Sequence, residues 1–172
     1  MVTNDPQICL EADGLVVPGV GAFAACMEQL ISIGGDKIIA NRMANSLPIF
    51  GICVGMQVFF DSSSEKGEHE GLGVLTGEIS KIAAPILPHT GWNTVSAPSS
   101  SQLFEGIGED SFYFVHSFAA KDEVPGALNT KSNYGEDFLA AVELKSLVAT
   151  QFHPEKSGAA GARLISNWVR SI

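Results

Sequence analysis

The sequence predicts an α/β fold with a mostly parallel central sheet, helices on both of its faces and additional antiparallel strands. Two short apolar segments, at residues 15–17 and 48–52, are each followed by residues with helical spacing, which is typical of parallel strands that alternate with helices. Several strand-like segments then follow one another in the second half of the chain. An amphipathic pattern at residues 161–172 predicts a closing helix.

Composition limits the possible functions. The chain has 172 residues, of which 45% are hydrophobic and 17% charged, so we expect one compact domain covering residues 1–172. The net charge of −9 argues against a nucleic-acid-binding protein, which needs clustered Lys and Arg. The three cysteines have no disulfide or zinc spacing, and no signal peptide or long apolar segment is visible. We therefore expect a cytoplasmic protein that binds neither membrane nor metal.

The first half of the chain alternates apolar strands with helical patterns. Pro18-Gly19 stops the first strand, Gly34-Gly35 can end the first long helix, and Asp36 can cap the next one. The predicted elements are a strand at 15–17, helices at 22–33 and 36–44, a strand at 48–52 and a helix at 55–60. The side chains expected to point into the core from the two long helices are Phe23, Met27, Leu30, Ile31, Ile38, Ile39 and Met43.

The second half is richer in strands. Residues 61–73 are polar and contain glycine, so we expect a loop there. The elements predicted after it are strands at 74–75 and 78–82, an irregular proline-containing stretch at 85–98, a strand at 111–119, a strand pair at 138–144 and 146–152, and a helix at 161–172. The closing helix is expected to bury Leu164, Ile165, Trp168 and Val169. In such sheets, sites lie at the carboxyl ends of the strands.

A cysteine stands at one of these ends, in Gly51-Ile52-Cys53-Val54-Gly55. This is the arrangement of a sharp strand-to-helix turn that presents a nucleophile. Side chains two positions before and after the nucleophile would collide in such a turn, so glycine is required there. We expect the first amides of the following helix to favour the thiolate of Cys53. Cys9 and Cys26 are expected to be small apolar fillers.

A base and an orienting carboxylate lie one hundred residues further on. His153 and Glu155 are two positions apart, so in extended backbone they point to the same side, and the carboxylate can fix the imidazole tautomer. The alternative for His153 is a surface or satisfied core histidine. His89 and His116 have no partners at metal-ligand spacing, so we expect structural or solvent-facing roles for them, and His69 is expected to be solvated.

Nucleophilic attack on an amide also needs donors for an oxyanion. The Val54 N–H at the start of the helix is one candidate. The turn Pro18-Gly19-Val20-Gly21 can present a second backbone N–H from the neighbouring strand. The alternative for this turn is a plain connection between a strand and a helix.

Four segments together carry a family resemblance: 15–23, 51–57, 87–93 and 151–157. With these segments the sequence resembles the class I, triad-type glutamine amidotransferases, which implies a flavodoxin-like α/β sandwich. The nucleophile turn and His-Pro-Glu are shared across that class. Pro-Gly-Val-Gly-Ala-Phe and Pro-His-x-Gly-Trp-Asn are narrower, and they resemble the glutaminase subunits of imidazole glycerol phosphate synthases.

The resemblance implies a role for each matched residue. Cys53 attacks the side-chain amide of glutamine and forms a thioester, His153 protonates the leaving ammonia and then activates water, and Glu155 orients His153. The residues implied to bind glutamine or its oxyanion are Gly19, Val20, Gly21, Val54, Gln57, Glu65, Ser117 and Phe118. The residues implied to face a partner are Trp92, Asn93 and Lys156.

The resemblance also implies where the ammonia goes. In this family the ammonia passes within a heterodimer to a (β/α)₈ cyclase subunit. There it reacts with a phosphoribulosyl-formimino aminoimidazole carboxamide ribotide, giving imidazole glycerol phosphate and an aminoimidazole carboxamide ribotide. This is a step of histidine biosynthesis, and the glutaminase subunit itself needs no cofactor.

The match begins after the first strand–helix unit of the family pattern, which corresponds to about 35 residues. We expect such a chain to be less stable than longer relatives, or to associate through an exposed strand edge. Thr90 and Phe118 also depart from the family pattern, where methionine and an aromatic hydroxyl are common. Binding through the backbone at residue 118 would survive that change.

Two other functions remain open from the sequence. One is another triad amidotransferase, serving pyridoxal phosphate, anthranilate or nucleotide synthesis, and Trp92-Asn93 argues against it. The other is a catalytically silent form that only binds a partner. The presence of Cys53, His153 and Glu155 argues against that form.

Overall fold

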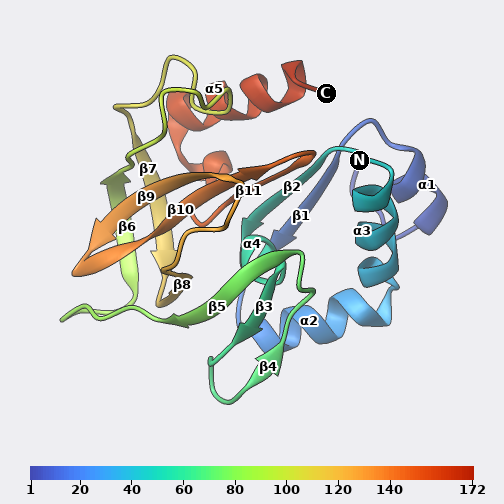
Figure 1. Cartoon of the computed structure of the whole chain (residues 1–172), viewed down its shortest axis with the longest axis horizontal. Coiled ribbons are helices and arrows are strands. Elements are labelled where there is room, and N and C mark those ends of the chain that lie inside the picture. Colours follow the sequence, from blue (N-terminus) through green and yellow to red (C-terminus); the bar gives the residue numbers. More distant parts are fainter.

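A five-stranded mixed sheet organises the computed structural model, which describes residues 1–172. In spatial order its strands are β1 (Leu15–Gly19), β2 (Ile49–Cys53), β11 (Leu147–Thr150), β10 (Glu136–Leu144) and β9 (Leu128–Tyr134). The first three run parallel to one another, and β10 and β9 continue the sheet antiparallel (Figure 1). The parallel core and its antiparallel extension agree with the fold class predicted from the sequence.

Two smaller sheets lie beside this main sheet. One has the order β4 (His69–Glu70), β3 (Phe60–Ser63), β5 (Leu75–Lys81) and β8 (Phe118–Ala120), and the other pairs β6 (His89–Thr94) with β7 (Ser111–His116). Only Ser117 separates β7 from β8, so the chain passes from one small sheet to the other within a single residue.

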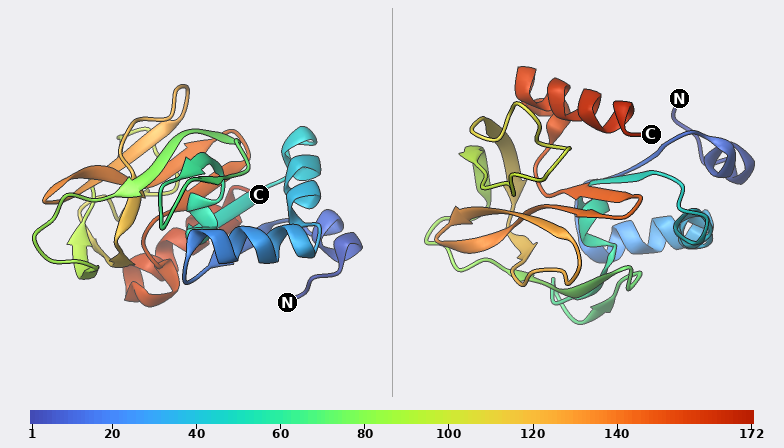
Figure 2. Two further views of the ribbon diagram at one scale, coloured as in Figure 1. Left: turned by 90° about the horizontal axis from the view of Figure 1, so that it is seen from below. Right: turned by 45° about the horizontal axis from the view of Figure 1, so that its top comes forward.

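Helices cover both faces of the main sheet. They are α1 (Pro6–Glu11), α2 (Phe23–Ser32), α3 (Gly35–Ala44), α4 (Val54–Gln57), the short 3₁₀ helix η1 (Pro154–Lys156) and α5 (Gly158–Arg170). The views in Figure 2 place α5 (red) apart from α2 and α3 (blue to cyan). None of these helices has the length and apolar character needed to cross a bilayer.

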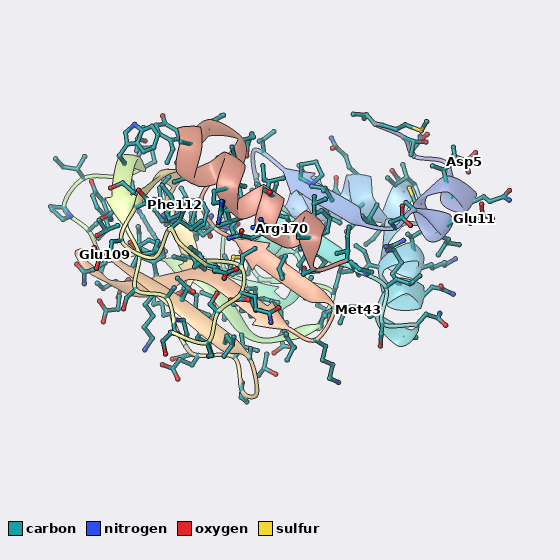
Figure 3. All side chains as sticks on the ribbon, turned by 90° about the horizontal axis from the view of Figure 1, so that it is seen from above. Asp5, Glu11, Met43, Glu109, Phe112 and Arg170 are labelled. Carbon is teal, nitrogen blue, oxygen red and sulfur yellow. The ribbon has the colours of Figure 1, made fainter.

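Alternation along β2 divides the interior into two cores. Ile49 points into a core formed with α2, α3 and α4, whereas Phe50 points into a core formed with α5. The Phe50 ring packs edge-to-face on Trp168 of α5, with ring centroids 5.3 Å apart. In Figure 3, Phe112 marks this second core and Arg170 marks the end of α5.

A buried arginine ties the N-terminal helix to the sheet. Arg42 of α3 has no exposed surface, and its guanidinium donates hydrogen bonds only to backbone carbonyl groups. The acceptors are the carbonyl oxygens of Cys9, Leu10, Ala12, Asp13 and Pro48. The side chain therefore satisfies the carbonyls at the end of α1 and the one that precedes β2.

Several predicted elements are wrong in extent. The helix predicted at 55–60 ends at Gln57, because Phe60 pairs with Leu75 as the start of β3. The loop predicted at 61–73 contains most of β3 and all of β4, and the irregular stretch at 85–98 contains β6. The strand predicted at 111–119 is interrupted at Ser117. In each case pairing with a sequence-distant strand overrides the local pattern.

The helix boundaries also differ in detail. Gly34, with φ of 70°, stands at the N-cap of α3, and Asp36 lies inside its first turn rather than capping it. Ile31 and Val169 were expected to face the core but are 55% and 52% exposed, because each lies at the edge of its helix's apolar stripe. The sequence analysis did not predict α1 or β9.

Candidate active site

The carboxyl ends of three parallel strands meet at one edge of the main sheet. Gly19 of β1 lies opposite Cys53 of β2, and Thr150 of β11 lies opposite Ile52. The chain segments that leave these ends are therefore neighbours in space, although they are far apart in sequence. They carry the turn after β1, the cysteine and the histidine that the sequence singled out.

Cys53 occupies a strained turn between β2 and α4. Its φ of 56° and ψ of −115° lie outside the regions that L-residues favour. A Cβ on Gly55 would come within 1.9 Å of the Val17 carbonyl oxygen, and one on Gly51 within 2.4 Å of the Phe59 ring. The turn thus requires glycine at both positions, as the sequence predicted.

Burial controls the ionisation of this cysteine. Desolvation raises the pKa of Cys53 from 9.0 to about 11, and the nearby Glu155 carboxylate adds to the rise. The Val54 amide, which hydrogen-bonds the sulfur, opposes the shift but does not overcome it. The expected thiolate is therefore wrong for this resting structure. The physical reason is that desolvation of the buried sulfur outweighs the hydrogen bond from the Val54 amide at the start of α4.

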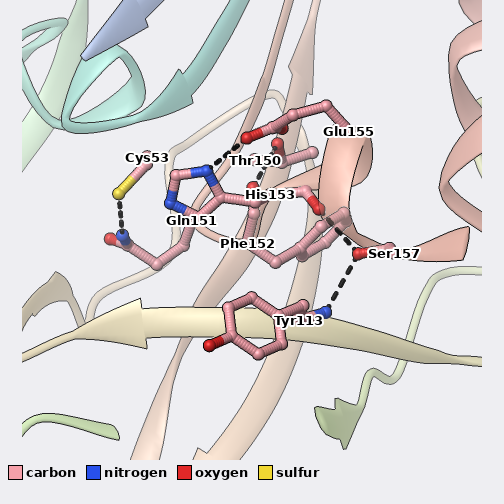
Figure 4. Close-up of polar contacts among 8 residues, drawn as sticks. All are labelled: Cys53, Tyr113, Thr150, Gln151, Phe152, His153, Glu155 and Ser157. Atoms are coloured by element: carbon pink, nitrogen blue, oxygen red, sulfur yellow. Dashed lines mark hydrogen bonds and ion pairs between the residues drawn. The ribbon is translucent and has the colours of Figure 1, made fainter. Parts of the chain in front are cut away.

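Glu155 holds the ring of His153, and Ser157 holds its backbone carbonyl. Its Nδ1 lies 2.6 Å from Glu155 Oε1, and its Nε2 is buried without a hydrogen-bond partner. In Figure 4, this second nitrogen faces the side of the ring on which Cys53 lies. The Ser157 hydroxyl donates to the His153 carbonyl at 2.7 Å and accepts from the Tyr113 amide at 2.9 Å. The arrangement leaves Nε2 free to accept a proton.

Two glutamine side chains connect the cysteine to the cleft wall. Gln151 Nε2 lies 3.8 Å from Cys53 Sγ, and Gln151 Oε1 accepts from Gln57 Nε2 at 2.9 Å. Gln57 Nε2 also donates to the Phe118 carbonyl at 2.9 Å. The sequence analysis did not single out Gln151 or Ser157. Both residues lie in the 151–157 segment, which carries the family resemblance, and this position was the signal that could have identified them.

A cleft of about 500 Å³ opens over Cys53 and His153. Its walls include seven of the eight residues predicted to bind glutamine or its oxyanion: Val20, Gly21, Val54, Gln57, Glu65, Ser117 and Phe118. The cleft is large enough for one amino-acid substrate. It brings together backbone amides, a carboxylate and the Cys53–His153 pair.

The turn after β1 forms one rim of this cleft. Gly19, the eighth of those residues, packs against the Val54 and Gly55 backbone, where a Cβ would come within 2.6 Å of the Gly55 nitrogen. Val20 is 76% exposed, and Gly21 has a φ of 95°. Cys26 Sγ donates to the Val20 carbonyl at 3.3 Å, so this cysteine is more than the apolar filler that the sequence suggested.

The side chain of Glu65 reaches the first residue of α2. Its Oε2 accepts from the Phe23 amide at 2.8 Å, which caps the first turn of the helix. The carboxylate therefore presents negative charge to the cleft from a fixed position. A carboxylate held in this way suits an α-ammonium group.

Two of the three residues predicted to face a partner are exposed, and the third is half-buried. Trp92 on β6 is 59% exposed, and its ring meets Tyr113 edge-on with centroids 6.1 Å apart. Asn93 is half-buried and donates to the Asn133 carbonyl at 2.9 Å. Lys156 is exposed and lines the cleft.

Two of the remaining histidines are buried rather than solvent-facing. His89 and His116 face each other across β6 and β7, with Nδ1 of the first 3.0 Å from Nε2 of the second. Burial lowers the pKa of both, that of His116 to about 3. No three histidine, cysteine, aspartate or glutamate side chains gather in an arrangement that could hold a metal ion.

The fold of this chain has known counterparts. The family model for class-I glutamine amidotransferases matches residues 2–172, so the chain belongs to that family and is a glutamine amidotransferase. A crystal structure of a glutamine amidotransferase superposes with a TM-score of 0.74 at 17% identity, covering 97% of this chain and 85% of the other. The glutaminase domain of Trypanosoma brucei CTPS with bound acivicin superposes with a TM-score of 0.63 at 16% identity, covering 96% and 74%. These likenesses confirm the predicted fold class.

Sequence comparison identifies the subfamily within this class. The chain is 54% identical to the imidazole glycerol phosphate synthase subunit HisH of Nocardia farcinica, covering 99% of this chain and 85% of the relative. It is 49% identical to HisH of Thermobifida fusca over 99% and 86%, and 52% identical to HisH of Mycobacterium tuberculosis over 99% and 85%. The chain belongs to the HisH family of glutamine amidotransferases.

Proposed function

We propose that this chain, acting as one domain over residues 1–172, is the glutaminase subunit of an imidazole glycerol phosphate synthase. In this role it hydrolyses glutamine to glutamate and ammonia and passes the ammonia to a cyclase subunit of the cytoplasmic enzyme. The observation that carries the proposal is the convergence of Cys53, His153 and Glu155 in one cleft. The HisH relatives, about half of whose residues are identical to this chain, support the assignment to histidine biosynthesis.

The first half of the reaction is thioester formation. His153 Nε2 takes the thiol proton as Cys53 Sγ bonds to the side-chain amide carbon of glutamine. The oxyanion that forms accepts hydrogen bonds from backbone N–H groups at Val54 and in the Val20-Gly21 turn. His153 then returns the proton to the leaving nitrogen, the C–N bond breaks, and ammonia departs.

The second half is hydrolysis. His153, now neutral again, removes a proton from water while the water oxygen attacks the thioester carbon. The C–S bond breaks, the proton returns to sulfur, and glutamate leaves. Glu155 keeps its hydrogen bond to Nδ1 throughout, so it fixes the tautomer and stabilises the imidazolium that forms twice.

The raised pKa of Cys53 favours control by a partner. A buried, protonated thiol is a weak nucleophile, so we expect the chain alone to turn over glutamine slowly. Lys156 lines the cleft, and Trp92 packs on Tyr113, whose carbonyl accepts from the His153 amide. A cyclase subunit bound over Lys156, Trp92 and the adjoining Asn93 is therefore in a position to reorganise the site. The exposed Trp92 is a suitable anchor for such an interface.

The test is glutamate release from glutamine, measured with and without the cyclase subunit of an imidazole glycerol phosphate synthase and its nucleotide ligand. We expect partner-dependent release that Cys53→Ala abolishes. Cys9→Ala is the matched control, because it removes a buried thiol that lies in α1, outside the cleft. Release that survives in Cys53→Ala would contradict the nucleophile, and release unaffected by the cyclase would contradict the partner.

A further inference from the structure

Two buried histidines that the proposed chemistry does not use lie against the glutamine cleft. We propose that Asn93, His89 and His116 form a hydrogen-bonded relay that positions the Phe118 carbonyl in the cleft wall and links it to the half-buried Asn93, where β6 meets β9. His89 and His116 are then positioning residues for glutamine binding. This inference rests on the proposed function, because it concerns the same cleft.

The relay is continuous from β6 to the cleft. Asn93 Nδ2 lies 3.4 Å from His89 Nε2, His89 Nδ1 lies 3.0 Å from His116 Nε2, and His116 Nδ1 lies 3.1 Å from the Phe118 carbonyl oxygen. Both rings are buried, with 3% and 6% of their surface exposed. No other polar group competes for these four ring nitrogens.

The Phe118 carbonyl determines which ring nitrogen of each histidine carries the proton. A carbonyl oxygen can only accept, so His116 Nδ1 must donate, and the neutral ring then accepts at Nε2. His89 Nδ1 must therefore donate to it, which leaves His89 Nε2 to accept from the Asn93 amide. All donors point inward, and protonation of His116 Nε2 would set two N–H groups against each other.

Packing holds the relay in place. His89 is stacked between Tyr134 and Phe114, with ring centroids 4.0 Å and 4.9 Å away and planes within 14° and 19° of parallel. His89 and His116 are also direct partners in the register of β6 and β7. The rings therefore cannot turn without disturbing both strands.

The relay meets the cleft at two neighbouring places, the His116 ring, which itself lines the cleft, and the Phe118 carbonyl. The Phe118 carbonyl accepts from His116 Nδ1 and also from Gln57 Nε2, and Gln57 continues to Gln151 and the Cys53 sulfur. Phe118 is the first residue of β8, directly after Ser117, and it pairs with Lys81 of β5. Strand pairing sets the position of the residue, and the two side-chain hydrogen bonds hold the direction of its carbonyl group.

The outer end of the relay reaches the surface. Asn93 uses its second amide hydrogen to donate to the Asn133 carbonyl on β9, and its side chain is half-buried on the same side of β6 as His89. A molecule that contacts Asn93 where it meets β9 would displace its amide group. The relay would pass that displacement to the Phe118 carbonyl, and so to the cleft.

The test compares two substitutions of one ring, made in a Cys53→Ala parent so that glutamine binds without reacting. His116→Asn keeps a donor near the position of Nδ1, whereas His116→Gln keeps an acceptor near the position of Nε2 and loses the donor to Phe118. Titration calorimetry should give a glutamine Kd within about twofold of the parent for His116→Asn and about tenfold weaker for His116→Gln. Equal effects of the two substitutions would overturn the relay.

A second arm tests the outer end. Asn93→Ala should weaken glutamine binding about threefold, whereas Asn133→Ala, which retains the backbone carbonyl, should leave it unchanged. Nitrogen-15 spectra of the parent should show both His89 and His116 as neutral Nδ1–H tautomers at pH 7. An Nε2–H tautomer of either ring would overturn the relay, whether or not the variants fold.

Glutamine binding by the Cys53→Ala parent separates a failure of the proposed function from a failure of the relay. A Cys53→Ala chain that binds no glutamine would overturn the proposed function together with the relay. A parent that binds glutamine but responds equally to both His116 substitutions would overturn the relay alone.

Discussion

The protonation state of Cys53 governs the chemistry available to this chain. Burial keeps the thiol protonated at neutral pH, so the site does not store a reactive thiolate. The unpartnered Nε2 of His153 provides the acceptor when the thiol attacks. A nucleophile of this kind is activated only when substrate and base are aligned, which limits wasteful hydrolysis.

The pH dependence of Cys53 alkylation should reveal the protonation state of the thiol directly. The folded pKa lies above the ordinary value, so the thiolate fraction, and with it the rate, should rise about tenfold per pH unit from pH 7 to 10 without levelling off. Peptide-level mass spectrometry after timed iodoacetamide treatment measures the rate. The same chain in urea is the control, where the rate should level off near pH 9. A plateau by pH 8 in the folded chain would contradict the raised pKa.

Ser157 positions His153 without touching substrate. Its hydroxyl joins the His153 carbonyl to the Tyr113 amide, so Ser157→Ala should lower kcat about tenfold while changing KM little. The measurement is steady-state glutaminase kinetics with the activating partner. Ser171→Ala removes a similar hydroxyl-to-carbonyl bond at the end of α5 and should leave kcat unchanged. Equal effects of the two changes would rule out the positioning role.

Among the helices and strands, the junction of α1, α3 and β2 depends on one side chain. Arg42 satisfies five backbone carbonyls without a carboxylate partner. The Pro48 carbonyl also accepts from the Leu15 amide, whereas the other four acceptors lie at the end of α1 and just after it, where the helix offers no further backbone donors. Arg42 thus ties the N-terminal helix to α3 and β2.

Arg42→Met should therefore destabilise the chain by about 3 kcal/mol or more, since it leaves several buried carbonyls unpaired. Urea unfolding monitored by circular dichroism measures the change. Arg163→Met, on the exposed side of α5, is the control and should shift stability by less than about 0.5 kcal/mol. A small effect of Arg42→Met would mean that water reaches these carbonyls.

For the molecule as a whole, one edge of the main sheet is left open at β1. β1 pairs only with β2, so its other side carries backbone groups without strand partners, and Val16 on it is 44% exposed. Such an edge is a template for pairing with another chain. Pairing of two copies along β1 would bury this edge, as an additional strand beside β1 would.

We expect the isolated chain to associate with rising concentration, and Val16→Lys to suppress this association because a charge on an edge strand opposes pairing. Sedimentation velocity over a concentration series measures it. Val169→Lys, at an exposed position of α5, should not alter the behaviour. A monomer at every concentration would contradict the expectation.

The sequence by itself determined the nucleophile turn, the His-Pro-Glu segment and the two apolar strands that became β1 and β2. These features are local: glycines around Cys53, the two-residue spacing of His153 and Glu155, and continuous apolar runs are legible without knowing what lies nearby.

Only the tertiary structure decided the rest. It paired Phe60 with Leu75, placed His89 opposite His116, and brought Gln151 against Cys53, contacts that join residues up to 98 positions apart. It also reversed the expected ionisation of Cys53, because desolvation depends on what surrounds the sulfur rather than on its neighbours in sequence. Pairing, burial and hydrogen-bond direction belong to the folded chain, and local patterns do not encode them.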